Sequence, residues 1–242
     1  MRVASATELQ TEAAPPRAWT LTKLLQFLVM LSVWIGGGLL AAGTFRWLRG
    51  WIFTVAMLSG YAIMGLYVHR KNPGVLSARA EWSHGDTQRF DKLFFLLFAP
   101  LYMAQPAVAG LDAVRFRWSS MPFATVYLGL ALQACGMAFI AWAMAVNPFA
   151  ERTVRIQSEK QHVTVTAGPY RIVRHPMYLG ALAMFTATGL VFGSWWTLLI
   201  GLVLSLLFVW RTAMEDRFLL RALPGYNEFA QSTRYRLIPG VW

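Results

Sequence analysis

Hydrophobic residues in this chain are gathered into runs of about twenty, and short polar segments separate the runs. A helix needs about 20 apolar residues to cross the hydrocarbon core of a bilayer, where it satisfies its own backbone hydrogen bonds. The pattern therefore predicts an all-α integral membrane protein with about six transmembrane helices. The predicted spans are Leu21–Thr44, Trp51–Val68, Leu93–Leu111, Pro122–Val146, Met177–Phe192 and Trp195–Trp210, the last continuing as a cytoplasmic helix to about Leu223.

Proline and glycine residues predict kinks, close packing and a tight connection in these spans. Pro100 and Pro106 are expected to kink the third helix, because proline lacks the N–H of a helical hydrogen bond. The glycines at 36–38 indicate close helix packing or local flexibility in the first helix. Only Gly193 and Ser194 separate the fifth helix from the sixth, so these two helices must be antiparallel neighbours.

The basic residues are distributed unevenly between the two sides of such a bundle. Of the 22 Lys and Arg residues, 18 fall on the side that holds both termini and the loops 69–92 and 147–176. Because basic residues accumulate on the cytoplasmic side, we expect both termini to be cytoplasmic. The four basic residues of the opposite side are Arg46, Arg49, Arg115 and Arg117.

Composition narrows the class of protein further. The chain is 57% hydrophobic and 14% charged, whereas soluble domains carry about 25% charged residues. The net charge of +11 does not indicate nucleic-acid binding, because the basic residues lie between apolar runs. The single Cys135 and four scattered histidines predict neither a disulfide nor a metal site. Residues 1–20 lack the apolar core of a signal peptide and are interpreted as a flexible tail.

After the tail, the chain is predicted to consist of a four-helix transmembrane region, 21–146, and a carboxyl-terminal catalytic region, 147–242. The loop 69–92 begins with the turn signal Asn72-Pro73-Gly74 and is interpreted as a solvated loop or a lid at a substrate entrance. The next polar segment contains "TVRIQ" and "HVTVT", whose alternating β-branched residues predict a small β-hairpin.

Candidate chemistry is concentrated in "GPYRIVRHPMYLG", residues 168 to 180. His175 precedes Pro176, which is favoured at the first position of a helix, and Tyr178 lies one turn further on. The N–H groups of this helix start, together with Arg171 and Arg174, favour an anion such as a carboxylate or phosphate. The alternative interpretation is that the arginines bind lipid headgroups and the tyrosines form an interfacial belt.

Two acidic residues, Glu215 and Asp216, lie just past the end of the sixth apolar span. Because the fifth and sixth helices form a hairpin, Glu215 is predicted to lie beside His175 in space. Arg211 is spaced to pair with Glu215 at i, i+4. A structural ion-pair cluster that closes the hairpin is the alternative to a binding site here.

Such a site would suit S-adenosylmethionine or NADPH. It offers carboxylates for ribose hydroxyls or an ammonium group, arginines for an anion, and aromatic rings for a cation or a base. Neither a glycine-rich dinucleotide fingerprint nor a phosphate-binding loop is present in the chain.

The motifs "GPYRIVRHPMYLG", "MEDRFL" and "PGYNEFAQSTRYRLIPGVW" together resemble the isoprenylcysteine carboxyl methyltransferase and phospholipid N-methyltransferase superfamily, and most closely its bacterial members of unassigned substrate. The resemblance covers about residues 145–242. It implies a cytoplasmic-side S-adenosylmethionine pocket in a bacterial inner membrane protein. The resemblance places Asp216 where family members often have Glu, which makes Glu215 the safer assignment of the two. The residues that it implies at the cofactor are Gly168, Pro169, Tyr170, His175, Tyr178, Glu215 and Asp216, with catalytic roles for Arg174, His175, Arg211 and Glu215.

The expected function is therefore methyl transfer from S-adenosylmethionine to a lipophilic small molecule or lipid-like acceptor, with the acceptor atom and the oligomeric state left open. A sterol-reductase-type enzyme that uses NADPH is one alternative. A non-enzymatic lipid-binding or transport subunit is another. Transport is disfavoured because no ionisable residue lies near the centre of a predicted helix.

Overall fold

The structure is a computed structural model that describes residues 21–80 and 87–242, so the predicted flexible tail, 1–20, lies outside the described residues. All regular elements of the described residues are helical, with no strand among them. The α-helices are α2 (Leu21–Ala42), α3 (Leu48–Lys71), α4 (Pro73–Arg79), α5 (Arg89–Ala109), α6 (Thr125–Val146), α7 (Pro176–Phe192), α8 (Trp195–Ala222) and α9 (Tyr226–Ser232). A π-helical turn, Gly110–Arg115, follows α5, and two 3-10 turns are formed by Ser158–Lys160 and Gly168–Arg171.

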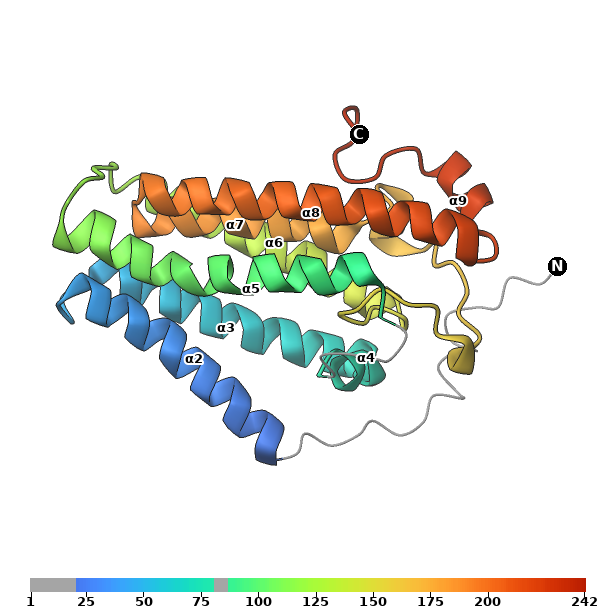
Figure 1. Ribbon diagram of the computed structural model, residues 1–242, viewed down its shortest axis with the longest axis horizontal. Helices are drawn as coiled ribbons and strands as arrows, with labels where there is room; N and C mark the ends of the chain where they lie inside the picture. Colours follow the sequence, from blue (N-terminus) through green and yellow to red (C-terminus); the bar gives the residue numbers. More distant parts are fainter. Residues whose placement is uncertain (1–20, 81–86) are drawn as a thin grey trace.

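Helices α2, α3, α5, α6, α7 and α8 run alongside one another in an elongated bundle (Figure 1). Helices α3, α6 and α8, and α5 with its π turn, are long and apolar enough to cross a membrane. Helix α7, with 17 residues, and the stretch Leu28–Ala42 of α2 are shorter apolar helices. These findings confirm the prediction of an all-α integral membrane protein, because the lipid-facing helices satisfy their own backbone groups.

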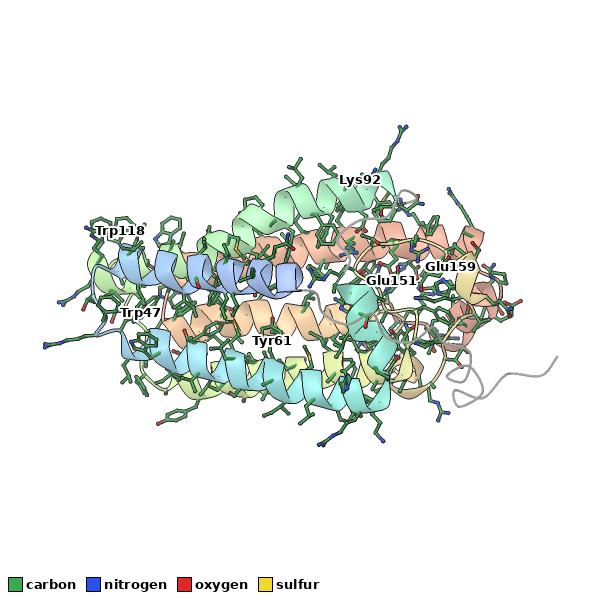
Figure 2. All side chains as sticks on the ribbon, turned by 90° about the horizontal axis from the view of Figure 1, so that it is seen from below. Trp47, Tyr61, Lys92, Trp118, Glu151 and Glu159 are labelled. Atoms are coloured by element: carbon green, nitrogen blue, oxygen red, sulfur yellow. The ribbon has the colours of Figure 1, made fainter. Side chains whose placement is uncertain are left out.

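The two ends of the bundle differ in character. Helices α4 and α9 and the loop between α6 and α7 lie together at one end, which we call the polar end (Figure 1). Lys92, Glu151 and Glu159 lie at this end, whereas Trp47 and Trp118 lie at the opposite end (Figure 2). Charged side chains of α5 and of the loop between α6 and α7 thus lie at the polar end.

Helices α6 and α7 approach each other at backbone distance. A Cβ atom added to Gly136 of α6 would lie 2.6 Å from the carbonyl oxygen of Gly180, and one added to Gly180 would lie 2.6 Å from the carbonyl oxygen of Gly136. Helices α7 and α8 are equally close, since a Cβ on Gly201 would lie 2.5 Å from the carbonyl oxygen of Phe185. The antiparallel hairpin predicted for these helices is therefore present and tightly packed.

Helix α5 continues through Pro100 and Pro106 to Ala109. Because Pro106 has no N–H, the carbonyl of Tyr102 loses its helical donor, and Trp34 Nε1 donates to that oxygen at 3.3 Å. A side chain from α2 thus satisfies the backbone group that the proline leaves open.

The predicted β-hairpin is wrong, because residues 153–157 and 162–166 form no ladder. The N–H of Val154 donates to Asp91 Oδ2 at 2.8 Å, and the carbonyl of Val154 accepts from Gln88 N at 3.4 Å. The backbone groups that a partner strand would need are therefore bonded to the start of α5. The side chain of Gln157 is also turned inward, where its Nε2 donates to the carbonyl of Phe149 at 2.8 Å.

The turn predicted at Asn72 is followed directly by α4, and residues 81–86 of the predicted loop lie outside the described residues. Asn72 Nδ2 donates to the carbonyls of Met144 at 2.9 Å and Asn147 at 3.1 Å. This side chain ties α4 to the end of α6, which places α4 at the rim of the polar end.

Replacing Gly180 by Ala should destabilise the bundle by about 1–3 kcal/mol, because the added methyl group has to displace the α6 backbone. Gly65→Ala is the matched control, since a Cβ at Gly65 has nothing within 4 Å. We expect a lower unfolding temperature in detergent for the first variant and an unchanged or higher one for the second. Equal unfolding temperatures would contradict the close α6–α7 approach.

Candidate functional site

The candidate site lies where the start of α7, the last turns of α8 and the carboxyl-terminal tail meet at the polar end. The backbone N–H of Arg174 donates to the carbonyl of Tyr235 at 2.9 Å, and that of His175 donates to the carbonyl of Arg236 at 3.0 Å. His175 is the residue before the first turn of α7, with Pro176 at the first helical position. The tail therefore holds the entrance to α7 in place through main-chain hydrogen bonds.

His175 and Glu215 lie next to each other, as the short hairpin predicts. The distance from His175 Nδ1 to Glu215 Oε1 is 3.8 Å. Tyr178 donates to Glu215 Oε2 at 2.5 Å, and its ring stacks on the His175 ring with 5.7 Å between centroids. An imidazole, a phenol and a carboxylate thus share one small volume at the junction of α7 and α8.

Asp216 has a different environment from Glu215. Its side chain is fully buried, whereas 18% of the Glu215 side chain is exposed. Asp216 Oδ2 accepts from Arg236 Nε at 2.7 Å, and Oδ1 lies 3.2 Å from Arg174 Nε and 3.4 Å from His175 Nε2. A buried carboxylate that joins three segments in this way stabilises the fold before it can serve any ligand.

Tyr226 of α9 completes the environment of Asp216, to whose Oδ1 it donates at 2.9 Å. Burial, and then the Asp216 carboxylate, raise the pKa of Tyr226 well above its ordinary value, so the hydroxyl stays protonated as a donor. Sequence reasoning missed Tyr226 and Arg236. The only available signal was that both belong to the motif "PGYNEFAQSTRYRLIPGVW", in which no single residue stood out.

Arg211 does not form the predicted i, i+4 pair with Glu215. Instead, its Nη2 lies 2.8 Å from Oδ1 of Asp91, a fully buried residue of α5, and donates to the carbonyl of Arg152 at 2.6 Å. The guanidinium lies over the rings of Phe94, at 4.5 Å, and Tyr178, at 5.3 Å. Arg211 therefore pairs with a carboxylate of the neighbouring helix α5, while Glu215, one turn further along α8, lies beside His175.

Asp91 was missed because the contact spans 120 positions of sequence. Its only sequence signal is an acidic residue in the first turn of an otherwise apolar helix. In the structure it connects the amino-terminal helices to the site through Arg211. Its other oxygen, Oδ2, accepts a hydrogen bond from the N–H of Val154, whereas Oδ1 lies beside the Arg211 charge and accepts no hydrogen bond among the described residues.

The turn formed by Gly168, Pro169 and Tyr170 supports the site without touching His175 through any hydrogen bond among the described residues. Gly168 has a φ of +59°, and a Cβ there would lie 3.0 Å from the indole nitrogen of Trp142. Asn147 Nδ2 donates to the Tyr170 hydroxyl at 2.7 Å. Burial raises the pKa of Tyr170 to about 12, so this residue is a fixed neutral group.

Two observations identify groups that a ligand could use. Asp216 is an acceptor for His175 Nε2, so in the neutral imidazole the proton belongs on Nε2 and Nδ1 is an acceptor. Nδ1 then faces Glu215 Oε1, a second acceptor, with no donor of the described residues between them. In addition, Nε of Arg211 is buried without an acceptor in the described structure. The site therefore offers paired acceptors when His175 is neutral, together with the buried Nε groups of Arg174 and Arg211, which make no hydrogen bond among the described residues.

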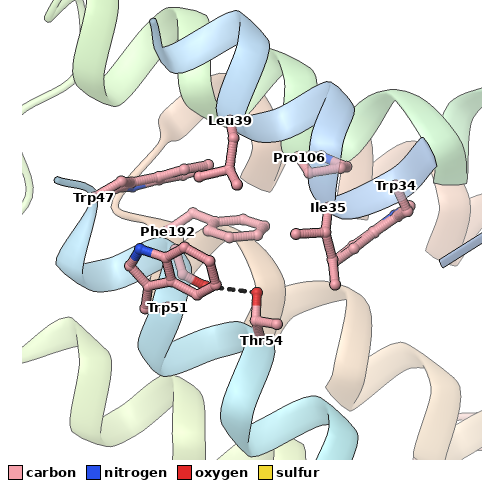
Figure 3. A pocket seen from close by; sticks show the side chains of 9 residues that line it. Trp34, Ile35, Leu39, Trp47, Trp51, Thr54, Pro106 and Phe192 are labelled. Atoms are coloured by element: carbon pink, nitrogen blue, oxygen red, sulfur yellow. Dashed lines mark hydrogen bonds between the residues drawn. The ribbon is translucent and has the colours of Figure 1, made fainter. Parts of the chain in front are cut away.

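Within the described residues, neither a metal site nor the small apolar cavity of the bundle is an alternative to this site. No group of three or more His, Cys, Asp or Glu side chains in residues 21–80 and 87–242 is arranged to hold a metal ion. A cavity of about 10 Å³ lies between Trp34, Trp47 and Phe192 near the other end of the bundle (Figure 3). It is apolar and no larger than the space that one water needs. It therefore cannot hold a substrate.

Comparison with known proteins places the carboxyl-terminal helices in context. Residues 124–224, from α6 through α8, match the phospholipid methyltransferase family. A stretch of 79 residues is 34% identical to the cobalt-zinc-cadmium resistance protein CzcN of Cupriavidus metallidurans. This stretch covers 32% of the present chain and 37% of CzcN. The chain thus spans little more than a third of the length of this curated relative.

Neutralising Asp216 and Glu215 one at a time should distinguish the residue that stabilises the fold from the residue that is available to a ligand. Asp216→Asn should destabilise the fold by about 3–5 kcal/mol, because it leaves Arg174 and Arg236 beside a buried neutral group. Glu215→Gln should change stability by about 1 kcal/mol or less, since the amide oxygen still accepts from Tyr178. Thermal unfolding in detergent and the rate of proteolysis of the tail after Ser232 measure the difference. Equal losses in both variants would contradict the structural role of Asp216.

Proposed function

We propose that this integral membrane protein transfers a methyl group from S-adenosylmethionine to a lipophilic acceptor, because residues 124–224 match the phospholipid methyltransferase family. The acceptor is a small lipophilic molecule or a lipid. The reaction takes place at the polar end of the bundle, which we propose faces the cytoplasm of a bacterial cell. The asymmetry of 18 against four basic residues supports that orientation.

The observation that carries the proposal is the 3.8 Å separation of His175 Nδ1 and Glu215 Oε1, which is too long for a direct hydrogen bond and leaves both atoms able to bind a ligand. A ligand donor placed between them would satisfy both groups. S-adenosylmethionine has such donors in its amino group and its ribose hydroxyls. The partial exposure of Glu215 supports access to the pair, and the residues present therefore fit this cofactor.

Other parts of the cofactor have matching groups in the site. The unsatisfied Nε–H of Arg211 and the start of α7 suit the carboxylate of the methionine moiety. The stacked rings of His175 and Tyr178 supply an aromatic surface. S-adenosylmethionine would supply an electrophilic methyl carbon on its sulfonium, and the protein then contributes alignment and exclusion of water.

Residues around the pair maintain its geometry. Asp216 and Tyr226 orient the His175 ring through Nε2, and the Tyr178 hydroxyl fixes one oxygen of Glu215. We assign Asp216 to positioning in place of direct cofactor contact, since its side chain has no exposed surface. Arg174 is likewise held by Asp216 and by the carbonyl of Ala230.

The acceptor determines whether a base is needed. A carboxylate or thiolate acceptor attacks without proton removal, whereas an alcohol or a protonated amine must first lose a proton. His175 Nδ1 and Glu215 Oε1 are the two groups placed to receive it. A lipophilic acceptor is expected because the apolar helices α5, α7 and α8 extend from the site along the bundle, so that an acceptor can arrive from the bilayer (Figure 1).

Removing either member of the acceptor pair should weaken cofactor binding. We expect His175→Ala and Glu215→Ala to weaken S-adenosylmethionine binding at least tenfold, measured by calorimetry on the purified protein in detergent. Arg115→Ala, at the opposite end of the bundle, is the control and should bind like the unmodified protein.

The same preparation tests the class of cofactor. S-adenosylmethionine should raise the unfolding temperature of the unmodified protein, and NADPH should not, because a ligand stabilises only the state that binds it. A shift with NADPH alone, or full binding by both alanine variants, would refute the assignment of the site. Labelled methyl should also appear in the lipid phase when the protein is incubated with membrane extract.

Asp91→Asn should lower methyl transfer about tenfold, because Arg211 then loses the charge that holds it against Tyr178. The matched control is Asp112→Asn, which neutralises another fully buried aspartate, at the opposite end of the bundle. Transfer of labelled methyl to membrane lipid, normalised to folded protein, measures both. Equal activity of the two variants would exclude the positioning role of Asp91.

A further inference from the structure

A second depression lies at the end of the bundle opposite the candidate site. Its volume is about 380 Å³, which is within the range of small-ligand sites. It is bounded by the start of α3, the connection between α5 and α6, and the turn between α7 and α8. The side chains considered below are those of Arg46, Trp47, Arg49, Ser119, Phe123 and the backbone at Gly193.

Arg49 is fixed in place within this depression. Its Nη2 donates to the carbonyl of Met121 at 2.7 Å, and its Nη1 donates to Thr125 Oγ1 at 3.3 Å. The guanidinium packs directly against Gly193, where any Cβ would clash with it, and lies 5.4 Å from the centre of the Phe123 ring. No carboxylate of the described residues forms an ion pair with it.

The rest of the depression adds positive charge and no accessible negative charge. The side chain of Arg46 is exposed and has no hydrogen bond or ion pair to the described residues. The acidic group beside the depression is Asp112, which is fully buried. Asp112 Oδ2 accepts from Ser119 at 2.6 Å and from Ser194 at 2.5 Å, so this carboxylate is used to hold the turn between α7 and α8.

Trp47 provides an additional donor that has no partner. The indole is 6% exposed, and its Nε1 has no acceptor among the described residues. The indole packs against Gly38 through Cζ3 and against Gly50 through Cγ, Cδ2 and Cε3. The ring lines this depression as well as the small apolar cavity.

Exposed aromatic side chains mark the level of the membrane at which the depression lies. Trp51, Trp118 and Trp195 are 41%, 66% and 59% exposed at this end of the bundle. Aromatic residues of this kind gather where a membrane protein crosses the lipid headgroup region. The depression is therefore at headgroup depth, where phosphate groups are the abundant anions.

We propose that this depression binds the headgroup of a phospholipid with net negative charge, with the phosphate on Arg49 and Arg46. Guanidinium groups bind phosphate through paired, charge-assisted hydrogen bonds. A zwitterionic headgroup would bring its own cation into a site that already has two. The proposal does not depend on the methyltransferase activity, because the two sites lie at opposite ends of the bundle.

The test uses the full-length protein in a neutral detergent, with phosphatidylglycerol or phosphatidylcholine added to the micelles. Phosphatidylglycerol should raise the unfolding temperature by several degrees, and phosphatidylcholine should raise it by less than half as much. Arg46→Gln and Arg49→Gln should each remove at least half of the phosphatidylglycerol shift. Arg115→Gln, at the same end but outside the depression, should retain it.

Two arginine variants are used so that the test still gives a result if one of them fails to fold. Arg49→Gln loses bonds that support the fold, whereas Arg46→Gln removes only an exposed side chain. Equal shifts with both lipids, or an equal loss in Arg115→Gln, would overturn the proposal. So would an equal shift with inorganic phosphate alone, which would indicate a soluble anion as the ligand.

Discussion

The buried carboxylate of Asp216 is the interaction on which the polar end of this protein depends. It joins helix α8 to the residue before α7, to α9 and to the carboxyl-terminal tail. Removing a carboxylate from water is costly, and the cost is offset only when all its partners are in place. Because the partners come from three different segments, this requirement forces the segments into one arrangement. Glu215, one residue earlier, is thereby directed toward His175.

The membrane imposes the second constraint. Helices that face lipid have to be apolar, so groups able to perform chemistry are confined to helix ends and the loops that connect them. Close packing through Gly136 and Gly180 brings α6 against α7, and the two-residue turn brings α8 beside α7. The apolar half of the structure therefore determines where the polar groups converge. The match of residues 124–224 to the phospholipid methyltransferase family is consistent with a site at this convergence.

Much of this arrangement could be predicted from the sequence, because its causes are local or depend on connectivity. Runs of apolar residues gave the helices, and the short connection at Gly193 and Ser194 implied that Glu215 returns to His175. The contacts that sequence reasoning missed are tertiary. Arg211 has Glu215 at helical spacing, yet it pairs with Asp91 of another helix. The alternating segment near Val154 has strand character, yet its backbone groups bond to the start of α5.

Hydrogen–deuterium exchange with and without S-adenosylmethionine tests the central claim most directly. The account predicts slower exchange on addition of the cofactor in two separated stretches, residues 168–178 and 211–217, and in the tail that hydrogen-bonds to Arg174 and His175. Helices α2 and α3 should be unaffected. Protection confined to other segments, or no change at a concentration of cofactor that supports methyl transfer, would contradict a cofactor site at the α7–α8 junction.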